Sequence, residues 1–234
     1  MNLPFVNQQP VEKRLEGDGS LLDVQEIFPT IQGEGPFAGV PSVFIRLAGC
    51  NLSEGCRLCD TDYTSRRKFY KVEDIVATVG LFRKSGLVVI TGGEPLRQPL
   101  GRLVRKLTQL RGYQVQIETN GTLFDETLEG TDRTIVCSPK TGSINQKLEL
   151  WINAYKYVLS ADQVDPTDGL PMSSLGFGVR PARPWNGFEG EVFVSPCDER
   201  DRGRNEANIK VAVDSCQKFG YRLSLQLHKI IGLP

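Results

Sequence analysis

The sequence lacks long apolar runs and any bias in charge. No segment approaches the roughly eighteen consecutive apolar residues that a membrane-spanning helix needs, and residues 1–19 contain no apolar signal core. The chain has 28 lysines and arginines against 28 aspartates and glutamates, with no long run of either sign. Composition therefore gives no indication of nucleic-acid or membrane binding. We expect a cytoplasmic protein of one domain or two small ones, because 234 residues with 39% hydrophobic composition allow a sizeable core.

Histidine and cysteine are also scarce. His228 is the only histidine, and it fits a structural hydrogen bond better than a catalytic base. The six cysteines are too few for a disulfide scaffold, and three of them, Cys50, Cys56 and Cys59, cluster with the spacing C-x5-C-x2-C. A structural zinc site needs four protein ligands and a ferredoxin-type cluster usually has four thiolates. Three thiolates predict an iron–sulfur cubane with one iron open to a small molecule. A zinc-binding module with Cys137 as fourth ligand is the alternative.

Strands and helices alternate along the rest of the chain. Period-2 or continuous apolar runs predict strands at 21–28, 42–47, 87–90, 113–118, 133–137, 155–159, 191–194 and 221–227. Helical spacing predicts helices over 72–82, 100–110 and 209–219, each followed by a glycine. This order predicts an α/β fold with a parallel sheet, and the modest length favours an incomplete parallel (βα) barrel. Residues 1–20 are expected to form a loose polar lead-in, and the Pro/Gly-rich residues 160–190 a long loop.

Unusual residues follow the predicted strands at their carboxyl ends. They are the cysteine loop, TGGEP at 91–95, ETNG at 118–121, SPK at 138–140, SP at 195–196 and HK at 228–229. Active sites of parallel α/β folds lie at this edge, so we expect all these groups around one mouth. The glycine-rich run at 31–36 has no G-K-[ST] and opens no helix, which favours a turn presenting Gln32 and Glu34 over a phosphate loop.

The cysteine loop, GGEP after one strand and ETNG after the next resemble the radical S-adenosylmethionine (radical SAM) superfamily. The runs IQGEG, PSVFIRLAGCNL, CDT, SPK and LSLQLHK are similar to the 7-carboxy-7-deazaguanine synthase family. The first cysteine gap is five residues where the superfamily usually has three, which changes the loop path but leaves C-x2-C intact. A glycyl-radical activase would share the triad and GGEP, but IQGEG, CDT and the terminal HK argue against it.

The family resemblance implies a carbon–nitrogen lyase. Its members convert 6-carboxy-5,6,7,8-tetrahydropterin to 7-carboxy-7-deazaguanine and ammonia, in the route to queuosine and related deazapurines. The implied chemistry is a 5′-deoxyadenosyl radical that abstracts hydrogen from substrate C6, with S-adenosylmethionine regenerated. The implied cofactors are a 4Fe-4S cluster, S-adenosylmethionine and Mg²⁺. The resemblance also implies a single radical SAM domain over 1–234, a homodimer, and an electron donor such as flavodoxin or ferredoxin.

The resemblance assigns roles to the residues at the strand ends. Cys50, Cys56 and Cys59 would hold the cluster, and Thr61 would coordinate Mg²⁺. S-adenosylmethionine would be bound by Leu58, Cys59, Asp60, Gly92, Gly93, Glu94, Glu118, Ser138, Pro139, Lys140, Ser195, Pro196, Cys197 and Asp198. The pterin would be bound by Ile31, Gln32, Gly33, Arg46, Thr91 and the terminal carboxylate of Pro234. Arg46, Thr91 and Glu118 would be catalytic, and a guanidinium suits a substrate carboxylate because it can donate two parallel hydrogen bonds. Whether Lys156 faces this pocket or the strand exterior stays open.

Overall fold

A curved, mostly parallel sheet forms the framework of the computed structural model, which describes residues 9–52, 59, 61–82, 84–174 and 178–233. The strands are β1 (Leu21–Ile31), β2 (Pro41–Leu47), β3 (Lys68–Lys71), β4 (Leu87–Gly92), β5 (Gln114–Thr119), β6 (Thr134–Cys137), β7 (Ala154–Leu159), β8 (Glu191–Pro196) and β9 (Arg222–Leu223). Their order in the sheet is β3-β1-β2-β4-β5-β6-β7-β8-β9. Strand β1 is antiparallel to β2 and β3, and every pairing from β2 to β9 is parallel.

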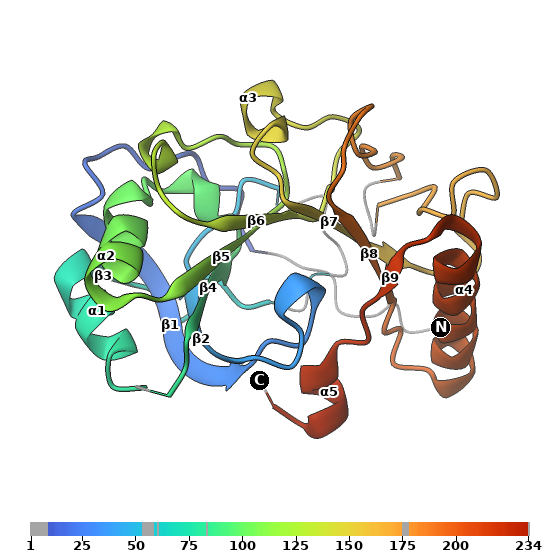
Figure 1. Ribbon diagram of the computed structural model, residues 1–234, viewed down its shortest axis with the longest axis horizontal. Coiled ribbons are helices and arrows are strands. Elements are labelled where there is room, and N and C mark those ends of the chain that lie inside the picture. The colour runs from blue at the N-terminus through green and yellow to red at the C-terminus, as the bar shows by residue number, and fades with distance from the viewer. Residues whose placement is uncertain (1–8, 53–58, 60, 83, 175–177, 234) are drawn as a thin grey trace.

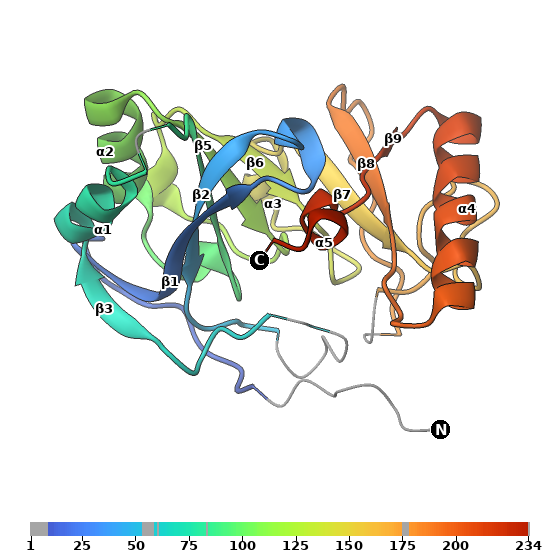
Figure 2. The ribbon, with the colours of Figure 1, turned by 90° about the horizontal axis from the view of Figure 1, so that it is seen from below.

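Apart from the short C-terminal helix, which lies at the open side of the sheet, the helices lie on its convex side (Figures 1 and 2). They are α1 (Val72–Val79), α2 (Gly101–Arg111), α3 (Gln146–Glu149), α4 (Arg202–Phe219) and α5 (Leu227–Ile231), with 3-10 turns η1 (Gly35–Phe37), η2 (Pro95–Arg97) and η3 (Glu126–Leu128). Buried side chains such as Ile45 and Ile117 pack with Ile75 of α1 and Leu103 of α2 in one core. Among the described residues no pairing joins β9 to β3, so the sheet stays open. The predicted incomplete parallel barrel is confirmed.

Alternation along the strands places polar side chains on the concave side. In β2, Val43, Ile45 and Leu47 belong to the core under the helices, so Arg46 points to the opposite face. The same reasoning places Glu118 of β5 and Lys156 of β7 on the concave face, because their strand neighbours lie in the core. Polar groups thus gather where the parallel strands end.

Two predicted elements are shorter than the sequence pattern suggested. The helix expected to reach residue 82 ends at Val79, and Gly80 caps it. The strand expected over 221–227 comprises only Arg222–Leu223, because Gln226 adopts a left-handed φ of 50° and the chain turns into α5. Leu223 and Leu225 alternate with polar residues but remain exposed, and β9 is the last strand at this edge of the described sheet.

The lead-in is not loose over residues 9–20, in contrast to the expectation. The Glu12 N–H donates to the Cys50 carbonyl at 2.8 Å, and the Leu15 N–H donates to the Arg97 carbonyl at 2.8 Å. Val11 also forms a parallel bridge with Cys50. This segment therefore packs against the start of the cysteine loop.

The segment 160–190 crosses from β7 to β8. Its described residues contain no helix, and the only regular feature among them is one bridge between Val164 and Pro171. Arg183 Nε lies 2.7 Å from Asp168 Oδ2, and the Tyr221 hydroxyl donates to the Asp168 carbonyl at 2.7 Å. Side-chain contacts to backbone and carboxylate thus order this crossover in place of a helix. None of the helices described for the chain has the length and apolar character needed to cross a membrane.

Candidate functional site

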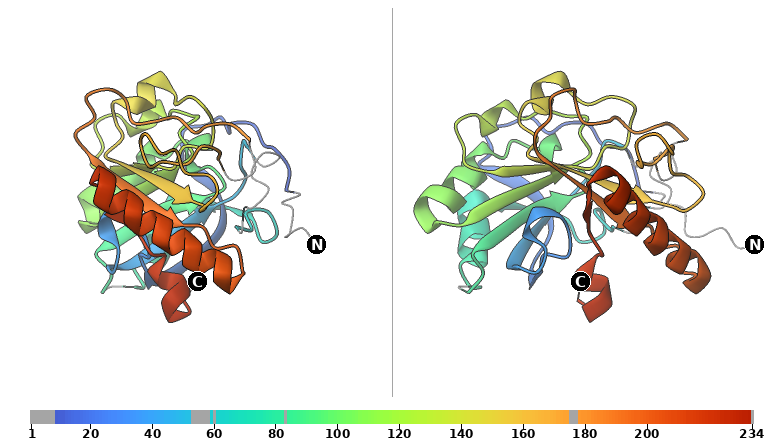
Figure 3. Two further views of the ribbon diagram at one scale, coloured as in Figure 1. Left: turned by 90° about the vertical axis from the view of Figure 1, so that its right-hand side faces the viewer. Right: turned by 45° about the vertical axis from the view of Figure 1, so that its right-hand side comes forward.

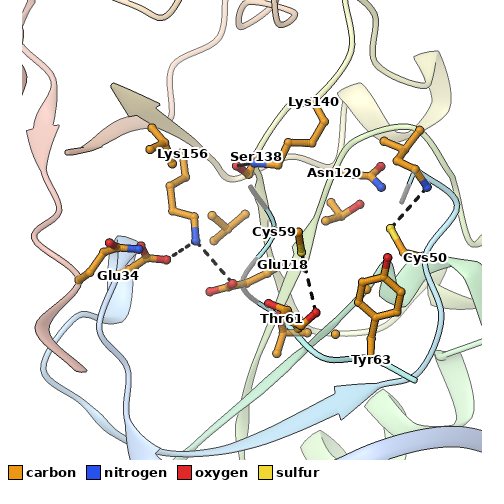
Figure 4. A pocket seen from close by; sticks show the side chains of 18 of the residues that line it. Glu34, Cys50, Cys59, Thr61, Tyr63, Glu118, Asn120, Ser138, Lys140 and Lys156 are labelled. Atoms are coloured by element: carbon orange, nitrogen blue, oxygen red, sulfur yellow. Dashed lines mark hydrogen bonds and ion pairs between the residues drawn. The ribbon is translucent and has the colours of Figure 1, made fainter. Parts of the chain in front are cut away.

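A pocket of about 310 Å³ opens on the concave face at the carboxyl ends of the parallel strands (Figure 4). Many of the residues assigned by resemblance line it: Cys50, Cys59, Thr61, Thr91, Gly92, Gly93, Glu118, Ser138, Lys140, Cys197 and Asp198. Others are described but are not part of the lining: Ile31, Gln32, Gly33, Arg46, Glu94, Pro139, Ser195 and Pro196. Cys56, Leu58, Asp60 and Pro234 lie outside the described residues. The structure thus brings groups from widely separated strand ends to one mouth.

Two thiols of the cysteine loop face this pocket. Cys50 and Cys59 form no disulfide with another described cysteine and contribute to its wall, and the Leu52 N–H donates to Cys50 Sγ at 3.5 Å. Backbone N–H groups directed at cysteine sulfur are typical of iron–sulfur sites, where they help to set the potential. Cys137 instead lies in the core on the other face of β6, where burial raises the pKa of its thiol. That placement argues against Cys137 as the fourth ligand of a zinc site.

Two glycines let the cysteine loop lie directly against β4. Gly92 has a φ of 137°, and a Cβ at this position would collide with the Leu47 carbonyl oxygen. A Cβ on Gly93 would collide with the Gly49 carbonyl oxygen and come within 2.7 Å of Cys50 Cβ. The Glu94 N–H donates to the Gly49 carbonyl at 3.0 Å. Glycine at both positions therefore allows the backbone of β4 to lie directly beside the start of the cysteine loop.

The Glu94 carboxylate is turned into the protein, away from the pocket. It is fully buried and accepts hydrogen bonds from the Leu96 N–H at 2.9 Å, the Thr119 hydroxyl at 2.8 Å and the Asn120 N–H at 2.7 Å. Glu94 is not part of the pocket lining, and its expected contact with S-adenosylmethionine stays a prediction. Glu94 fixes the TGGEP turn to the ETNG turn, and burial raises its pKa to about 7.

A Glu94→Gln variant should reveal this buried acid through the pH dependence of stability. The folded-state pKa of about 7 lies above the ordinary value of 4.5, so the folded protein binds the proton more tightly. Wild-type stability should fall as pH rises from about 5 to 8, by as much as about 3 kcal/mol from this group. The glutamine does not titrate. The difference in unfolding free energy between wild type and variant, measured with urea at both pH values, should narrow as pH rises. A constant difference would contradict the assignment.

An ionic triad of one buried lysine and two partly buried glutamates forms part of the wall of the pocket (Figure 4). Lys156 Nζ lies 2.5 Å from Glu34 Oε2 and 3.5 Å from Glu118 Oε2. The Glu118 Oε1 atom accepts from Gln32 Nε2 at 3.1 Å and from Gln116 Nε2 at 2.9 Å. Every oxygen of Glu118 thus has a donor, and Lys156 neutralises one of two carboxylates. The side chain of Lys156 belongs to the pocket, which resolves the question left open by its strand position.

The charges of the triad stabilise one another. Burial by itself would raise the pKa of Glu34, but the Lys156 ammonium, a hydrogen bond from Gln226 and His228 outweigh it and lower the pKa. Burial acts to lower the pKa of Lys156, yet Glu118 and Glu34 raise it overall. Glu34 and Lys156 are therefore both charged near neutral pH and form an ion pair in the wall of the pocket.

Arg46 lies on the concave face but its guanidinium has a partner already. Arg46 Nε is 3.0 Å from Glu26 Oε1, in an ion pair whose N–H is not aligned as a hydrogen bond. The guanidinium also lies 5.4 Å from the centroid of the Phe28 ring. In the parallel register Arg46 pairs with Thr91, which lines the pocket. Arg46 is therefore one strand away from the cavity, beside a residue that reaches it.

The C-terminal segment closes the open side of the sheet next to η1 (Figure 3). The Leu227 N–H donates to the Gly33 carbonyl at 3.0 Å, and a Cβ on Gly33 would collide with the His228 ring. Lys229 Nζ lies 3.5 Å from Asp198 Oδ2, and both residues line the pocket. The family-assigned Gly33 is thus required for close approach. Gln226 and Lys229, which belong to the LSLQLHK run but had no role assigned to them, complete the wall.

Comparison with known proteins agrees with this geometry. The sequence model of the radical SAM superfamily matches residues 44–142, which include the cysteine loop and both glycine-containing turns. A 7-carboxy-7-deazaguanine synthase of Rhodospirillum rubrum is 48% identical over 227 residues, which cover 93% of this chain and 94% of that protein. Its counterpart from Rickettsia prowazekii is 40% identical, covering 96% and 94%. The crystal structure of QueE from Escherichia coli superposes with a TM-score of 0.65 at 25% identity, covering 88% and 93%.

Proposed function

Because the chain belongs to the 7-carboxy-7-deazaguanine synthase family, radical SAM carbon–nitrogen lyases of queuosine precursor biosynthesis, we propose that its strand-end pocket binds 6-carboxy-5,6,7,8-tetrahydropterin and releases 7-carboxy-7-deazaguanine and ammonia. One observation supports this assignment most directly. The thiols of Cys50 and Cys59 and the Lys156–Glu34–Glu118 triad open into the same cavity. A redox centre and a polar substrate wall thus face each other.

The residues present fit a cluster and its nucleoside cofactor. Cys50, Cys56 and Cys59 would hold a 4Fe-4S cluster, since Cys50 and Cys59, the two described members of the set, both line the cavity. Gly93 offers backbone groups without side-chain obstruction to S-adenosylmethionine. Lys140, whose ammonium donates to Ser138 Oγ at 2.8 Å, offers a cation for its carboxylate. When bound, the two groups supply the one-electron bond cleavage that starts the reaction.

The triad suits the ring edge of a pterin. A 2-amino-pyrimidinone edge carries adjacent N–H donors, and the carboxylates of Glu34 and Glu118 are acceptors that face the pocket. Gln32 and Lys156 hold these carboxylates in place through the contacts described above. Arg46 would bind the substrate carboxylate by exchanging it for Glu26. Ring recognition and carboxylate recognition are then separated across the concave face.

Thr61 is proposed as the protein ligand of Mg²⁺. Thr61 lines the pocket near Cys59, and the Gln9 side-chain amide donates a hydrogen bond to the Thr61 carbonyl at 2.8 Å. Mg²⁺ keeps several waters and takes few protein oxygens, so one hydroxyl plus substrate oxygens is a sufficient site. We expect metal chelation to lower turnover about tenfold or more, because charge neutralisation at the substrate carboxylate is lost.

The Thr61→Val variant should lose most of this response to Mg²⁺, measured as product formation with and without added metal. Thr78→Val on the exposed face of α1 is the matched control and should respond as wild type does. Full activity of the wild type after chelation would contradict the magnesium site.

Product formation tests the function. Anaerobic incubation of the reconstituted protein with the carboxytetrahydropterin, S-adenosylmethionine and a reductant should yield 7-carboxy-7-deazaguanine and ammonia by mass spectrometry. Cofactor cleavage without either product would contradict the proposed substrate. We further propose one domain over 1–234, a homodimer, and an electron donor such as flavodoxin or ferredoxin. Light scattering and reduction by the purified donor would test the last two.

A further inference from the structure

A buried arginine lies behind the cysteine loop, on the side away from the pocket. Arg97 is only 1% exposed. Its Nη1 donates to the Lys13 carbonyl at 2.6 Å, and its Nη2 donates to the Ala48 carbonyl at 3.1 Å. The Nη2 atom also lies 3.2 Å from Glu12 Oε2. Arg97 thus connects the N-terminal segment to the start of the cysteine loop.

The guanidinium packs directly on the residue before the first cysteine ligand. Gly49 has a φ of 78°, and a Cβ on it would collide with the Arg97 guanidinium. The next residue is Cys50, whose carbonyl accepts from the Glu12 N–H at 2.8 Å. The positively charged Arg97 guanidinium therefore packs against Gly49, the residue that precedes Cys50. Its counter-anion, Glu12, touches the same cysteine through the backbone.

Glu12 also links the two ends of the cysteine loop. Its Oε1 atom lies 2.5 Å from Arg67 Nη1, and Arg67 pairs with Asp23 as well. These hydrogen bonds with Glu12 and Asp23 raise the pKa of Arg67. The Glu12 carboxylate therefore bridges Arg67, which follows the loop in sequence, and Arg97, which contacts the start of the loop. The arrangement holds the loop and fixes the local charges at the same time.

Buried charges act strongly on a nearby redox centre because solvent and salt screen them little. Reduction adds negative charge to a cluster, so a fixed cation stabilises the reduced form and a fixed anion opposes it. We propose that Arg97 is a positioning residue for the cysteine loop and that Arg97 and Glu12 shift the cluster reduction potential in opposite directions. This inference rests on the cluster assigned under the proposed function. It concerns residues outside the pocket that no motif of the chain identified.

Redox titration of the reconstituted full chain, without pterin, tests the inference. Cluster reduction would be followed by electron paramagnetic resonance, together with iron content. At the potential where half of the wild-type cluster is reduced, the reduced fraction should fall several-fold in Arg97→Met and rise in Glu12→Gln. Arg97→Lys should lie close to wild type because it keeps the charge. Glu16→Gln is the control for Glu12, since Glu16 is exposed in the same segment.

The outcomes distinguish an electrostatic effect on the cluster potential from structural disruption of the cysteine loop. A merely structural role would move both variants in one direction, or would lower iron content without opposite shifts, and either result would overturn the proposal. If Arg97→Met does not fold, Glu12→Gln and Arg97→Lys test the proposal in its place. An unchanged cluster potential in Glu12→Gln would then overturn the proposal. A wild-type protein that binds no cluster would overturn the proposed function as well, whereas a wild-type cluster without opposite shifts overturns only this inference.

Discussion

Replacing Cys59 with alanine should abolish deoxyadenosine formation. A cubane held by three thiolates that loses one of them retains two protein ligands, so the iron content should fall well below about four per chain. Cys59 lines the pocket beside Thr61, and no described cysteine other than Cys50 and Cys197 shares that wall. Iron analysis, visible absorbance and chromatography of the nucleoside products after anaerobic reduction would measure the effect.

Cys216→Ala is the matched control for this experiment. Cys216 lies on α4 and packs against the core, apart from the pocket lining. This variant should keep its iron and its deoxyadenosine yield, and lose at most the packing of one small side chain. A Cys59→Ala protein that still cleaves S-adenosylmethionine would show that the ligand assignment is wrong.

Replacing Lys156 with methionine should strongly destabilise the protein and prevent pterin binding. The ammonium separates the Glu34 and Glu118 carboxylates, and its removal leaves two buried acids facing each other. Removing one partner of a buried ion pair typically costs about 3–5 kcal/mol. One carboxyl can then take up a proton, so the variant should lose less stability at pH 5 than at pH 8. Urea unfolding of the cluster-free protein at both pH values would measure this.

Two further variants separate the triad from a general loss of charge. Lys106→Met removes a more exposed ammonium that lies 3.2 Å from Glu73, and surface pairs of this kind contribute at most about 1 kcal/mol. The double variant Lys156→Met, Glu34→Gln should recover part of the lost stability, because one of the opposing charges is gone. If Lys156→Met costs no more than Lys106→Met, the triad is not the electrostatic unit described here.

The ends of the strands from β4 to β8 could be predicted from the sequence because each of these strands carries its own evidence, whereas β3 was not predicted and β9 is shorter than predicted. A continuous apolar run such as 87–90 followed by TGGEP identifies both a buried strand and its functional end. Parallel connections then bring such ends to the same edge without any knowledge of contacts. This is why the pocket contains more than half of the described residues that the resemblance had assigned.

The direction of individual side chains could not be predicted in the same way. Glu94 occupies a motif position, yet its carboxylate serves three donors inside the protein, a role that depends on the neighbouring ETNG turn. Lys156 is charged within the buried strand AYKYVL, and only the pairing of that strand shows its partners Glu34 and Glu118. The packing of residues 9–15 likewise depends on Arg97, more than eighty positions later in the chain.

The contact between Gly33 and the segment after β9 has a consequence for the order of assembly during folding. It joins residues that are almost two hundred positions apart in the chain. The entropy lost on closing so long a loop is offset only after the intervening strands have packed together. Regular secondary structure should therefore return early in refolding, while the capacity to accept a pterin returns late. A partly folded chain would carry a nearly intact sheet whose cavity is still open on one flank.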